Sequence, residues 1–433
     1  MIGYKRTTLA TVSGLLLAAL TFIAGCDVFE VDNPGTIQDN DLNIPEAMDA
    51  LVTGMSADFS AEFDEIGFIG ARLSDELAAS GSYFLTTRAR RGVIEPEDTD
   101  GFWEGMQRAR FNAEDGIERM RNVLGESFGE QKRLGARALL MAGLSNRAFG
   151  ENFCRVVFEG GEAQPREAAF QRVLDQGFLD EAIDVAQTAG AEDVETAAKG
   201  VQAQLHMNLE NWSDAVQYAE QVPIDFVYHA TYSNNSTREY NEIYDETHQR
   251  YEMSAKETYV DGADDPRAPY TNCEEDTAQC TASNGADGVT THYRQEKYTG
   301  FGSDIPVVKG TEMRLIEAEA ALENGDVDMA MDKINEVREF WDLDPVSADV
   351  AGDVDQDGTA WAHLDRERGL SLWLEGRRLN DLRRWEHPFV TEGRGVVYED
   401  NVVEPRASCL PLAESECNNN PNVECDEDEA FNP

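Results

Sequence analysis

The sequence predicts a mainly α-helical fold built from antiparallel helix pairs of the tetratricopeptide type, with few short strands. Apolar residues recur every three or four positions over much of the chain, a spacing that gathers them on one face of a helix. The strict alternation of apolar and polar residues that marks a strand is scarce. Proline and glycine separate the periodic segments, for example at Pro223, Gly325, Pro345 and Pro388, so turns are expected between the helices.

The individual elements follow from this period. Helices are expected at 45–65, 102–124, 130–149, 167–187, 193–221, 311–324, 327–341 and 361–385. Short strands are expected near 225–229 and 394–403. The helical pattern is therefore interrupted once, after residue 225.

Two helical hairpins on either side of this interruption resemble each other. Ala203, Ala215 and Val222 recur at the same spacing as Ala318, Ala330 and Val337. Small alanines on facing helices allow close packing, which is how tetratricopeptide pairs stack. Two unrelated hairpins that share common residues remain the alternative.

Residues 226–310, between the two hairpins, lack the helical period and are rich in tyrosine, asparagine, threonine and glycine. A long loop-rich insertion on a helical scaffold is where binding surfaces are often found. This insertion is therefore the candidate ligand face.

The N-terminus has the features of an export signal. Lys5 and Arg6 precede an apolar run that ends near Ala24, which is the layout of a secretory signal peptide at 1–25. The run closes on Ile-Ala-Gly-Cys, which resembles a bacterial lipobox, so Cys26 is the expected site of lipidation and 26–44 the linker that follows the anchor. An ordinary signal peptide followed by a chance cysteine is the alternative.

The charge of the chain is strongly negative. Asp and Glu number 84 against 36 Lys and Arg, a formal net charge of −48. Nucleic acid, itself a polyanion, is therefore not an expected partner. Such self-repulsion disfavours the folded state at low ionic strength and is screened by concentrated salt. A salt-loving host explains this composition, and a need for high solubility is the competing explanation.

Apart from Cys26, the chain has six cysteines, an even number that suggests three disulfides in an exported protein. Sequence alone leaves 15 connectivities open. We favour the two pairs that close short loops, Cys273–Cys280 and Cys417–Cys425, which leave Cys154–Cys409. A zinc site is disfavoured because no C-x-x-C or paired-histidine spacing accompanies the cysteines.

Motifs of catalysis are absent from the sequence. There is no G-x-S-x-G, H-E-x-x-H, P-loop or dinucleotide fingerprint, so no catalytic residues and no cofactor are assigned. Asp353, Asp355 and Asp357, followed by a glycine, reproduce the first half of a calcium loop. The glutamate expected at its twelfth position is missing, so a solvated acidic turn competes with a Ca²⁺ site.

A dense motif lies towards the C-terminus. Residues 375–385, EGRRLNDLRRW, closely resemble the E-G-x-R-x-x-D-L-R-R-W signature of SusD/RagB-like nutrient-binding lipoproteins. Other landmarks of the family follow in its order: Phe149-Gly150-Glu151-Asn152, Asp265-Pro266-Arg267, Met313 to Leu322, Ile334-Asn335 with Val337-Arg338, Leu410 to Glu416, and Asn420-Pro421-Asn422. The chain departs from the pattern at Ser371, where the family often has an acidic residue.

The signature itself is expected to be structural. Its acidic and basic side chains recur at three- and four-residue spacing, at which opposite charges on a helix can pair. Trp373 and Trp385 are expected to be packed anchors, because large aromatics within a helical signature usually serve burial.

The resemblance implies a non-catalytic surface protein. In the family, a right-handed superhelix of tetratricopeptide-like pairs carries a less regular ligand-facing half. The lipoprotein captures a nutrient oligomer outside the cell and passes it to a SusC-like TonB-dependent transporter of the outer membrane. On this basis the regions are 45–225, helical; 226–310, the ligand face; 311–390, a helix pair and the signature; and 391–433, a cysteine-rich end.

Candidate ligand residues are chosen by chemistry. Sugars bind to aromatic faces and to side chains that donate or accept hydrogen bonds. The residues that suit this task are Tyr83, Phe84, Arg88, Tyr232, Asn235, Tyr244, Arg294 and Tyr298. Ordinary loop packing is the competing explanation for the tyrosines.

Alternatives to glycan capture stay open. A peptide ligand is compatible with the same family. A surface enzyme that cleaves glycans or peptides predicts turnover, and a structural adaptor predicts protein contacts without a small ligand. Asp27, directly after the lipidation site, favours inner-membrane retention under the sorting rule of some bacteria, whereas the family resemblance favours export to the cell surface.

Overall fold

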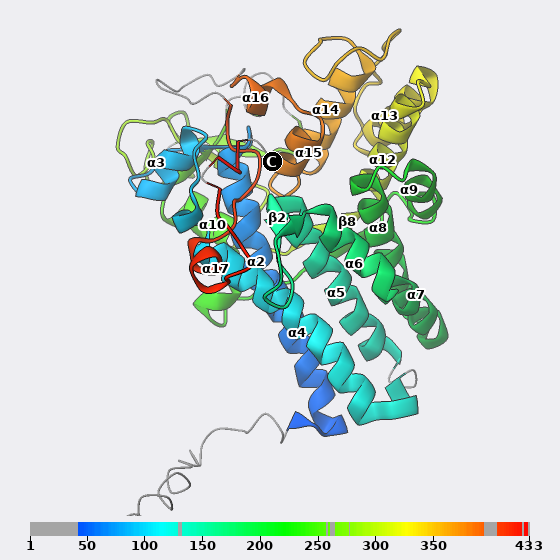
Figure 1. Ribbon diagram of the computed structural model, residues 1–433. Helices are drawn as coiled ribbons and strands as arrows, with labels where there is room; N and C mark the ends of the chain where they lie inside the picture. Colours follow the sequence, from blue (N-terminus) through cyan, green and yellow to red (C-terminus); the bar gives the residue numbers. More distant parts are fainter. Residues whose placement is uncertain are drawn as a thin grey trace, which may run out of the picture. The chain divides into compact units, whose positions relative to one another are not determined.

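Helices make up most of the chain, as the hydrophobic period predicts (Figure 1). A computed structural model describes residues 42–128, 132–256, 259, 265–276, 278–393, 405–426 and 428–431. All the elements named below lie in the unit Pro45–Pro433. The expected strand at 394–403 and the lipidation site Cys26 lie outside the described residues.

The longer helices follow the expected segments closely. They are α2 (Met48–Leu73), α4 (Asp100–Leu124), α5 (Lys132–Asn152), α6 (Glu167–Gln176), α7 (Phe178–Ala189), α8 (Glu192–Asn208), α9 (Trp212–Ala219), α12 (Gly310–Glu323), α13 (Val327–Phe340) and α14 (Ala360–Ser371). Shorter helices are α3 (Phe84–Arg90), α10 (Glu242–Tyr244), α15 (Arg378–Arg384), α16 (Pro388–Thr391) and α17 (Glu414–Asn419). Single turns are η2 (Pro45–Ala47), η3 (Pro96–Asp98), η4 (Gly125–Phe128), η5 (Thr237–Glu239) and the π-helical η6 (Asp245–Gln249).

The described strands are short and form two-stranded antiparallel ladders. β1 (Leu77–Ala79) pairs with β5 (Met253–Ala255), and β2 (Arg155–Val156) with β3 (Gln164–Pro165). β4 (Val227–Ala230), the strand expected near 225–229, pairs with β8 (Ile305–Lys309), and β6 (Tyr270–Asn272) with β7 (Tyr293–Gln295). Because β4 and β8 stand at the two ends of the insertion, their pairing closes it onto the scaffold.

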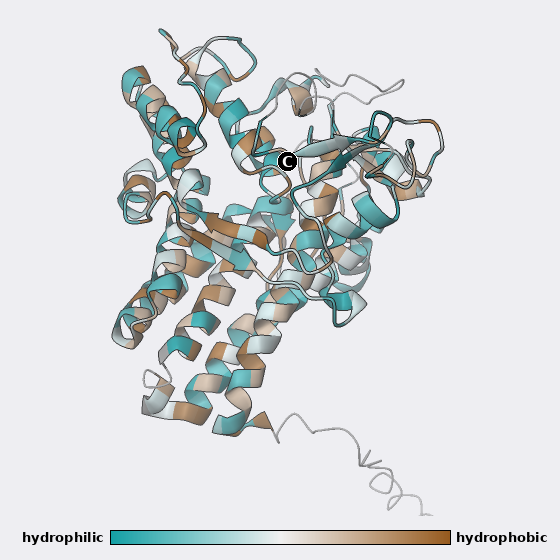
Figure 2. Ribbon diagram, turned by 180° about the vertical axis from the view of Figure 1, so that it is seen from behind, coloured by the Kyte–Doolittle hydropathy of each residue, from teal (hydrophilic) through white to brown (hydrophobic). Residues whose placement is uncertain are grey.

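Consecutive helices pack side by side, in the order α4, α5, α7, α8, α9, α12, α13. Hydrophobic and hydrophilic residues recur along these helices (Figure 2). The helix α12 is buried on nearly all sides. The repeated small residues are at the contacts: Ala203 and Ala215 are fully buried on α8 and α9, as are Ala318 and Ala330 on α12 and α13. The tetratricopeptide-like pairing is therefore confirmed.

Three expected helices are broken. The segment 193–221 forms α8 and α9, with a turn between Asn208 and Trp212. The segment 167–187 forms α6 and α7, separated by Gly177 with a φ of 66°, a left-handed conformation that glycine adopts without strain. The segment 361–385 ends as α14 at Ser371 and resumes as α15 at Arg378. Gly376, with a φ of 70°, lies in this break, so the expectation of one continuous signature helix was wrong.

The break brings two backbones together. A Cβ on Gly376 would lie 3.2 Å from the Cα of Gly67 on α2, closer than most side chains tolerate. The amide of Leu374 donates a hydrogen bond of 2.6 Å to the buried carboxyl of Glu76. Glycines at both positions therefore let the signature loop rest directly on α2.

The signature side chains do not mainly pair with one another. Of its ion pairs, Asp381–Arg384 joins residues within α15, and the others reach distant elements. Arg378 binds Asp75 at 2.7 Å and Asp365 on α14 at 2.5 Å. The expected pairing along one helix was therefore wrong for most of these charges.

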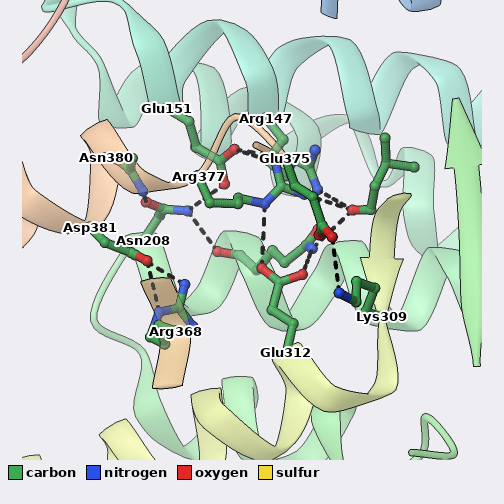
Figure 3. A network of polar contacts seen from close by, with 12 residues as sticks. Arg147, Glu151, Asn208, Lys309, Glu312, Arg368, Glu375, Arg377, Asn380 and Asp381 are labelled. Atoms are coloured by element: carbon green, nitrogen blue, oxygen red, sulfur yellow. Dashed lines mark hydrogen bonds and ion pairs between the residues drawn. The ribbon is translucent and has the colours of Figure 1, made fainter. Parts of the chain in front are cut away.

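Arg377 sits at the centre of this network (Figure 3). Its guanidinium contacts Glu151 of α5 at 3.2 Å and Glu312 of α12 at 3.4 Å, and donates to the carbonyl of Val307 in β8 at 2.7 Å. Arg147 contacts Glu151 at 3.4 Å and donates to the same carbonyl. These charged groups are buried, so each needs its partner to offset the loss of hydration.

The remaining charged residues of the signature form ion pairs with β8 and α12. The carboxylate of Glu375 forms ion pairs with the ammonium groups of Lys297 at 2.6 Å and Lys309 of β8 at 2.9 Å. Burial alone would raise the pKa of Glu375, but these two ammonium groups outweigh it and lower the pKa. Arg384 binds Glu319 of α12 at 2.7 Å, and Trp385 donates to the same carboxylate. Trp373 is completely buried, as expected of a packed anchor.

The structure contains three disulfides: Cys154–Cys409, Cys273–Cys280 and Cys417–Cys425. They are the three pairs favoured from the sequence. Cys154–Cys409 links residues 255 positions apart and joins the end of α5 to the C-terminal segment. Among the described helices, none has the length and apolar composition that a membrane crossing requires.

We expect Arg377→Ala to destabilise the fold by about 3–5 kcal/mol, because it leaves the buried carboxylates of Glu151 and Glu312 without this partner. Urea unfolding in molar salt measures the loss. The matched control is Arg133→Ala, which removes an exposed arginine paired with Asp193 and is expected to cost about 1 kcal/mol or less. Equal losses in the two variants would contradict the role of Arg377.

Removal of the long-range disulfide should cost more than removal of a local one. Loop entropy predicts roughly 5 kcal/mol for the Cys154→Ser/Cys409→Ser variant and roughly 2.5 kcal/mol for Cys417→Ser/Cys425→Ser. The reason is that the first bond closes a loop of 255 residues and the second a loop of 8. Denaturant unfolding of the two variants compares the losses, and the opposite order would refute the entropic account.

Stability should fall as the pH rises from about 5 to about 8. Burial raises the pKa of Glu76 from its ordinary 4.5 to about 8, so the folded chain retains a proton that the unfolded chain releases near pH 4.5. Glu76→Gln keeps an acceptor for Leu374 and removes the titration. The variant should lose less stability than the wild type over this window, by at least about 1.4 kcal/mol, the equivalent of one pKa unit. Parallel pH profiles in denaturant unfolding would contradict this assignment.

Candidate functional site

A pocket of about 380 Å³ opens between α2, the start of α4 and the segment that carries η5 and α10. We call it the α2–α10 pocket. Its lining residues are Ala61, Glu62, Asp64, Glu65, Leu85, Asp98, Gly101, Phe102, Arg108, Thr237, Arg238, Tyr240 and Glu242. Three sequence regions far apart in the chain therefore converge on one cavity.

Two arginines of the pocket are held by α2. Arg108 forms an ion pair with Glu62, and Arg238 forms one with Asp58. These pairs connect α4 and η5 to the same face of α2. They also leave two guanidinium groups at a partly exposed rim, where they can donate further hydrogen bonds.

The floor of the pocket is acidic. Asp64 is buried and accepts hydrogen bonds from the amides of Glu65 at 3.0 Å and Glu242 at 2.7 Å. Burial raises the pKa of Asp64 well above its ordinary value. Burial, together with the charge of Glu242, raises the pKa of Glu65 to about 7. Both oxygens of Asp64 are engaged by backbone amides, so this carboxyl fixes α10 against α2.

Aromatic rings form one side of the pocket. The ring of Tyr240 stacks on Phe301 with centroids 4.0 Å apart, and Tyr244 meets the same phenylalanine edge-on at 4.9 Å. Asn241 holds the turn between them, since its side chain accepts the amide of Tyr244 at 2.9 Å. Tyr240 is therefore presented from a braced aromatic cluster.

Three of the expected ligand residues lie on or beside α3, whose Leu85 lines the pocket. Tyr83 is 49% exposed and Phe84 is 71% exposed. The guanidinium of Arg88 lies over the Phe84 ring, 4.5 Å from its centroid. The same guanidinium binds Asp98, a lining residue, at 2.6 Å, and Glu95 at 2.9 Å. Arg88 thus braces the pocket wall and supports an exposed ring.

Two further expected residues flank the opposite side. Asn235 is exposed in the turn before η5, where its backbone N–H donates to the hydroxyl of Ser233 at 3.1 Å. Tyr244 belongs to the aromatic cluster behind Tyr240. None of these five expected residues lines the α2–α10 pocket itself. Arg88 binds the lining residue Asp98, and Tyr83, Phe84, Asn235 and Tyr244 are close in sequence to the lining residues Leu85, Thr237 and Glu242.

The other three expected ligand residues are not part of this site. Tyr232 and Tyr298 are buried, and their hydroxyls donate to the carbonyls of Ser60 at 2.8 Å and Leu374 at 3.0 Å. Arg294 binds Glu296 at 2.7 Å. These contacts suit packing, the explanation that competed with ligand binding, because buried hydroxyls need internal partners.

The geometry gives the calcium alternative no support. Asp353, Asp355 and Asp357 are exposed in the turn before α14. Within the described residues, no group of three or more histidine, cysteine, aspartate or glutamate side chains is arranged to hold a metal ion.

Sequence reasoning did not assign Phe102, Arg108, Arg238 or Tyr240 to the site. Acidic residues are so common in this chain that Glu62 and Glu65 carried no signal. The rarity of basic residues, 36 in 433, was the available clue to Arg108 and Arg238. As a whole, the arrangement can stack a flat apolar surface on a ring and exchange hydrogen bonds with hydroxyls.

Comparison with known proteins agrees with the signature. Residues 225–424 match the model of the SusD family, and no curated protein sequence matches the chain. A SusD-like protein from Bacteroides fragilis NCTC 9343 superposes with a TM-score of 0.67 and 13% identity, covering 90% of this chain and 98% of its own. A SusD superfamily protein from Bacteroides thetaiotaomicron VPI-5482 gives 0.63 and 14%, covering 88% and 99%.

A third similar structure is described as a SusD-like carbohydrate binding protein, from Bacteroides vulgatus ATCC 8482. Its TM-score is 0.57 at 13% identity, with 78% of this chain and 83% of that chain covered. At such identities the superpositions establish the fold. Residues 225–424 therefore match the SusD family, and the chain has a fold similar to that of these SusD-like structures.

Proposed function

We propose that this chain is a non-catalytic binding protein for oligosaccharides at the cell surface, and that it delivers them to a SusC-like TonB-dependent transporter of the outer membrane. The observation that carries the proposal is the α2–α10 pocket. It combines two aromatic side chains, Tyr240 and Phe102, with charged side chains, and the exposed rings of Tyr83 and Phe84 come just before its lining residue Leu85.

The chemistry of the pocket suits a sugar. The C–H face of a pyranose ring packs on an aromatic ring, and its hydroxyls exchange hydrogen bonds with carboxylates and guanidinium groups. A volume of about 380 Å³ is in the range of small-ligand sites. One of the similar structures is described as a carbohydrate binding protein, which agrees with a sugar ligand.

One argument for capture without cleavage is that Asp64, the buried carboxyl of the pocket, serves the fold. Asp64 is the most deeply buried carboxyl of the pocket, and backbone amides engage both of its oxygens. These hydrogen bonds give Asp64 a structural role, because they hold α10 against α2. The lack of nucleophile motifs in the sequence agrees with binding rather than turnover.

Anchoring and delivery rest on the sequence and the family. The lipobox places a lipid on Cys26, and a covalent lipid with several acyl chains holds a protein at a membrane without a spanning helix. A SusC-like transporter is the partner that the family resemblance implies. Co-purification of a large outer-membrane protein with the tagged native chain tests this part separately.

The ring positions should control affinity. In a glycan-library screen in molar salt, we expect one oligosaccharide class to bind, and Tyr240→Ala and Phe84→Ala to weaken it about tenfold each, a loss of about 1.4 kcal/mol. The matched control is Phe340→Ala, which removes another exposed ring, on α13, a helix with no residue in the pocket. Titration calorimetry measures all four proteins.

Other outcomes of this screen are equally informative. An effect of Phe340→Ala equal to that of Tyr240→Ala would overturn the assignment of the pocket. Binding of peptides in place of glycans would keep the capture role and change the ligand class. If neither glycans nor peptides bind, the proposal fails and the adaptor alternative is favoured.

A further inference from the structure

A second pocket departs from the acidic character of the chain. It has a volume of about 610 Å³ and lies between the end of α5, the start of α6, α15, α16 and the C-terminal segment. Its charged lining residues are Arg155, Arg166, Arg383, Arg406, Glu167 and Glu386. We call it the arginine pocket. Basic residues outnumber acidic ones in this lining, whereas over the whole chain acids outnumber bases by 84 to 36.

Arg383 contributes a buried positive charge that forms no direct ion pair among the described residues, although the charges of Glu167 and Glu151 stabilise it in part. Its guanidinium donates to the backbone carbonyls of Glu151 at 2.7 Å, Phe153 at 3.1 Å and Gly150 at 3.3 Å. These carbonyls end α5, and a helix C-terminus carries only about half a negative charge. The Nε of Arg383 has no acceptor in the part of the chain that the structure describes.

Burial and the nearby charge of Arg166 lower the pKa of Arg383 well below its ordinary value. A lowered pKa means that the charged form is destabilised where it stands. A bound anion in the adjacent cavity would offset this cost. The electrostatics of Arg383 therefore agree with the composition of the lining.

The other arginines retain capacity for a further partner. Arg166 pairs with the half-exposed Glu167 at 2.9 Å and donates to the side chain of Asn380 at 2.6 Å. Arg155 donates to both oxygens of Glu429, at 2.8 and 2.9 Å, and to the carbonyl of Glu424 at 3.1 Å. Arg406 is buried with its guanidinium 4.8 Å from the centre of the Phe389 ring. Since a guanidinium has five N–H donors, a single carboxylate does not exhaust Arg155 or Arg166.

The backbone adds to the positive character. The N-terminal end of α6 follows Arg166, and no side chain caps it. Free amides at a helix N-terminus favour anions. Three features therefore coincide at this cavity: the excess of arginine in the lining, the absence of a direct ion pair for Arg383 among the described residues, and the uncapped end of α6.

We propose that the arginine pocket binds an oxyanion group, a carboxylate or a sulfate, carried by a ligand of sugar size. Planar guanidinium groups bind such groups through two parallel hydrogen bonds, which a spherical chloride ion cannot accept. This difference matters for a chain whose acidic surface indicates concentrated salt. The site shares no lining residue with the α2–α10 pocket and does not depend on the function proposed there.

Titration calorimetry on the purified chain tests the proposal with two probes, inorganic sulfate and glucuronate, at constant ionic strength set with sodium chloride. Calorimetry is preferred to thermal shift because sulfate stabilises proteins generally by exclusion from their surfaces. We expect saturable binding of at least one probe. Binding of sulfate alone indicates a sulfate ester as the natural group, and binding of glucuronate alone indicates a carboxylate.

Three variants separate a site from general charge effects. Arg166→Gln should weaken binding at least tenfold. Glu167→Gln should tighten it several-fold, because it frees Arg166 from its acidic partner. Arg133→Gln, which removes the same charge from an exposed position, should leave it unchanged.

Arg166→Gln and Glu167→Gln are expected to change the affinity in opposite directions, so each checks the other. If Arg166→Gln fails to fold, the tightening in Glu167→Gln still supports the site. Absence of saturable binding of both probes over chloride would overturn the proposal. So would equal weakening in Arg166→Gln and Arg133→Gln, or weakening by Glu167→Gln.

Discussion

The fold depends on the burial of one charged run, Glu375 to Arg384, among helices and strands that lie far from it in the sequence. The charges of the run reach several elements: Glu375 holds β8, Arg377 joins α5 and α12, and Arg378 joins the end of α2 to α14. An unpaired charge in such a place would cost several kcal/mol. The pairs therefore specify how the helical scaffold and the insertion meet.

This constraint extends to the candidate site. Gly376 of the run rests on Gly67 of α2, and one turn earlier the same helix presents Glu62, Asp64 and Glu65 to the α2–α10 pocket. The position of α2 thus links the signature to the pocket without any signature residue facing the ligand.

The use of arginine also explains the acidic exterior. Arg147, Arg368, Arg377 and Arg406 are among the largest completely buried side chains, although the chain has only 36 basic residues. Arginines that balance acids inside the fold are not available at the surface, where most of the excess of acids remains. Salt screens the charges at this surface but has little effect on the buried ion pairs. The energy of the surface charges therefore depends on ionic strength more than that of the buried pairs.

The sequence predicted the parts of the structure that depend on local pattern. Helix positions follow from apolar spacing because each helix buries one face, and the disulfides follow from the preference for short loops. The break at 372–377 was missed because the apolar period continues across it, and only contact with α2 explains Gly376. Tyr232 and Tyr298 looked like ligand residues because composition does not distinguish a buried ring from an exposed one. Tyr240, Phe102 and Arg108 share a pocket through long-range packing that spacing does not encode.

The most direct test of the account is the fate of a bound glycan. The purified chain is saturated in molar salt with the oligosaccharide class that it retains, and the glycan is recovered after prolonged incubation and weighed by mass spectrometry. The account predicts saturable binding and an intact glycan at every time point. Shorter products that accumulate with time and protein concentration would show turnover and contradict the capture role.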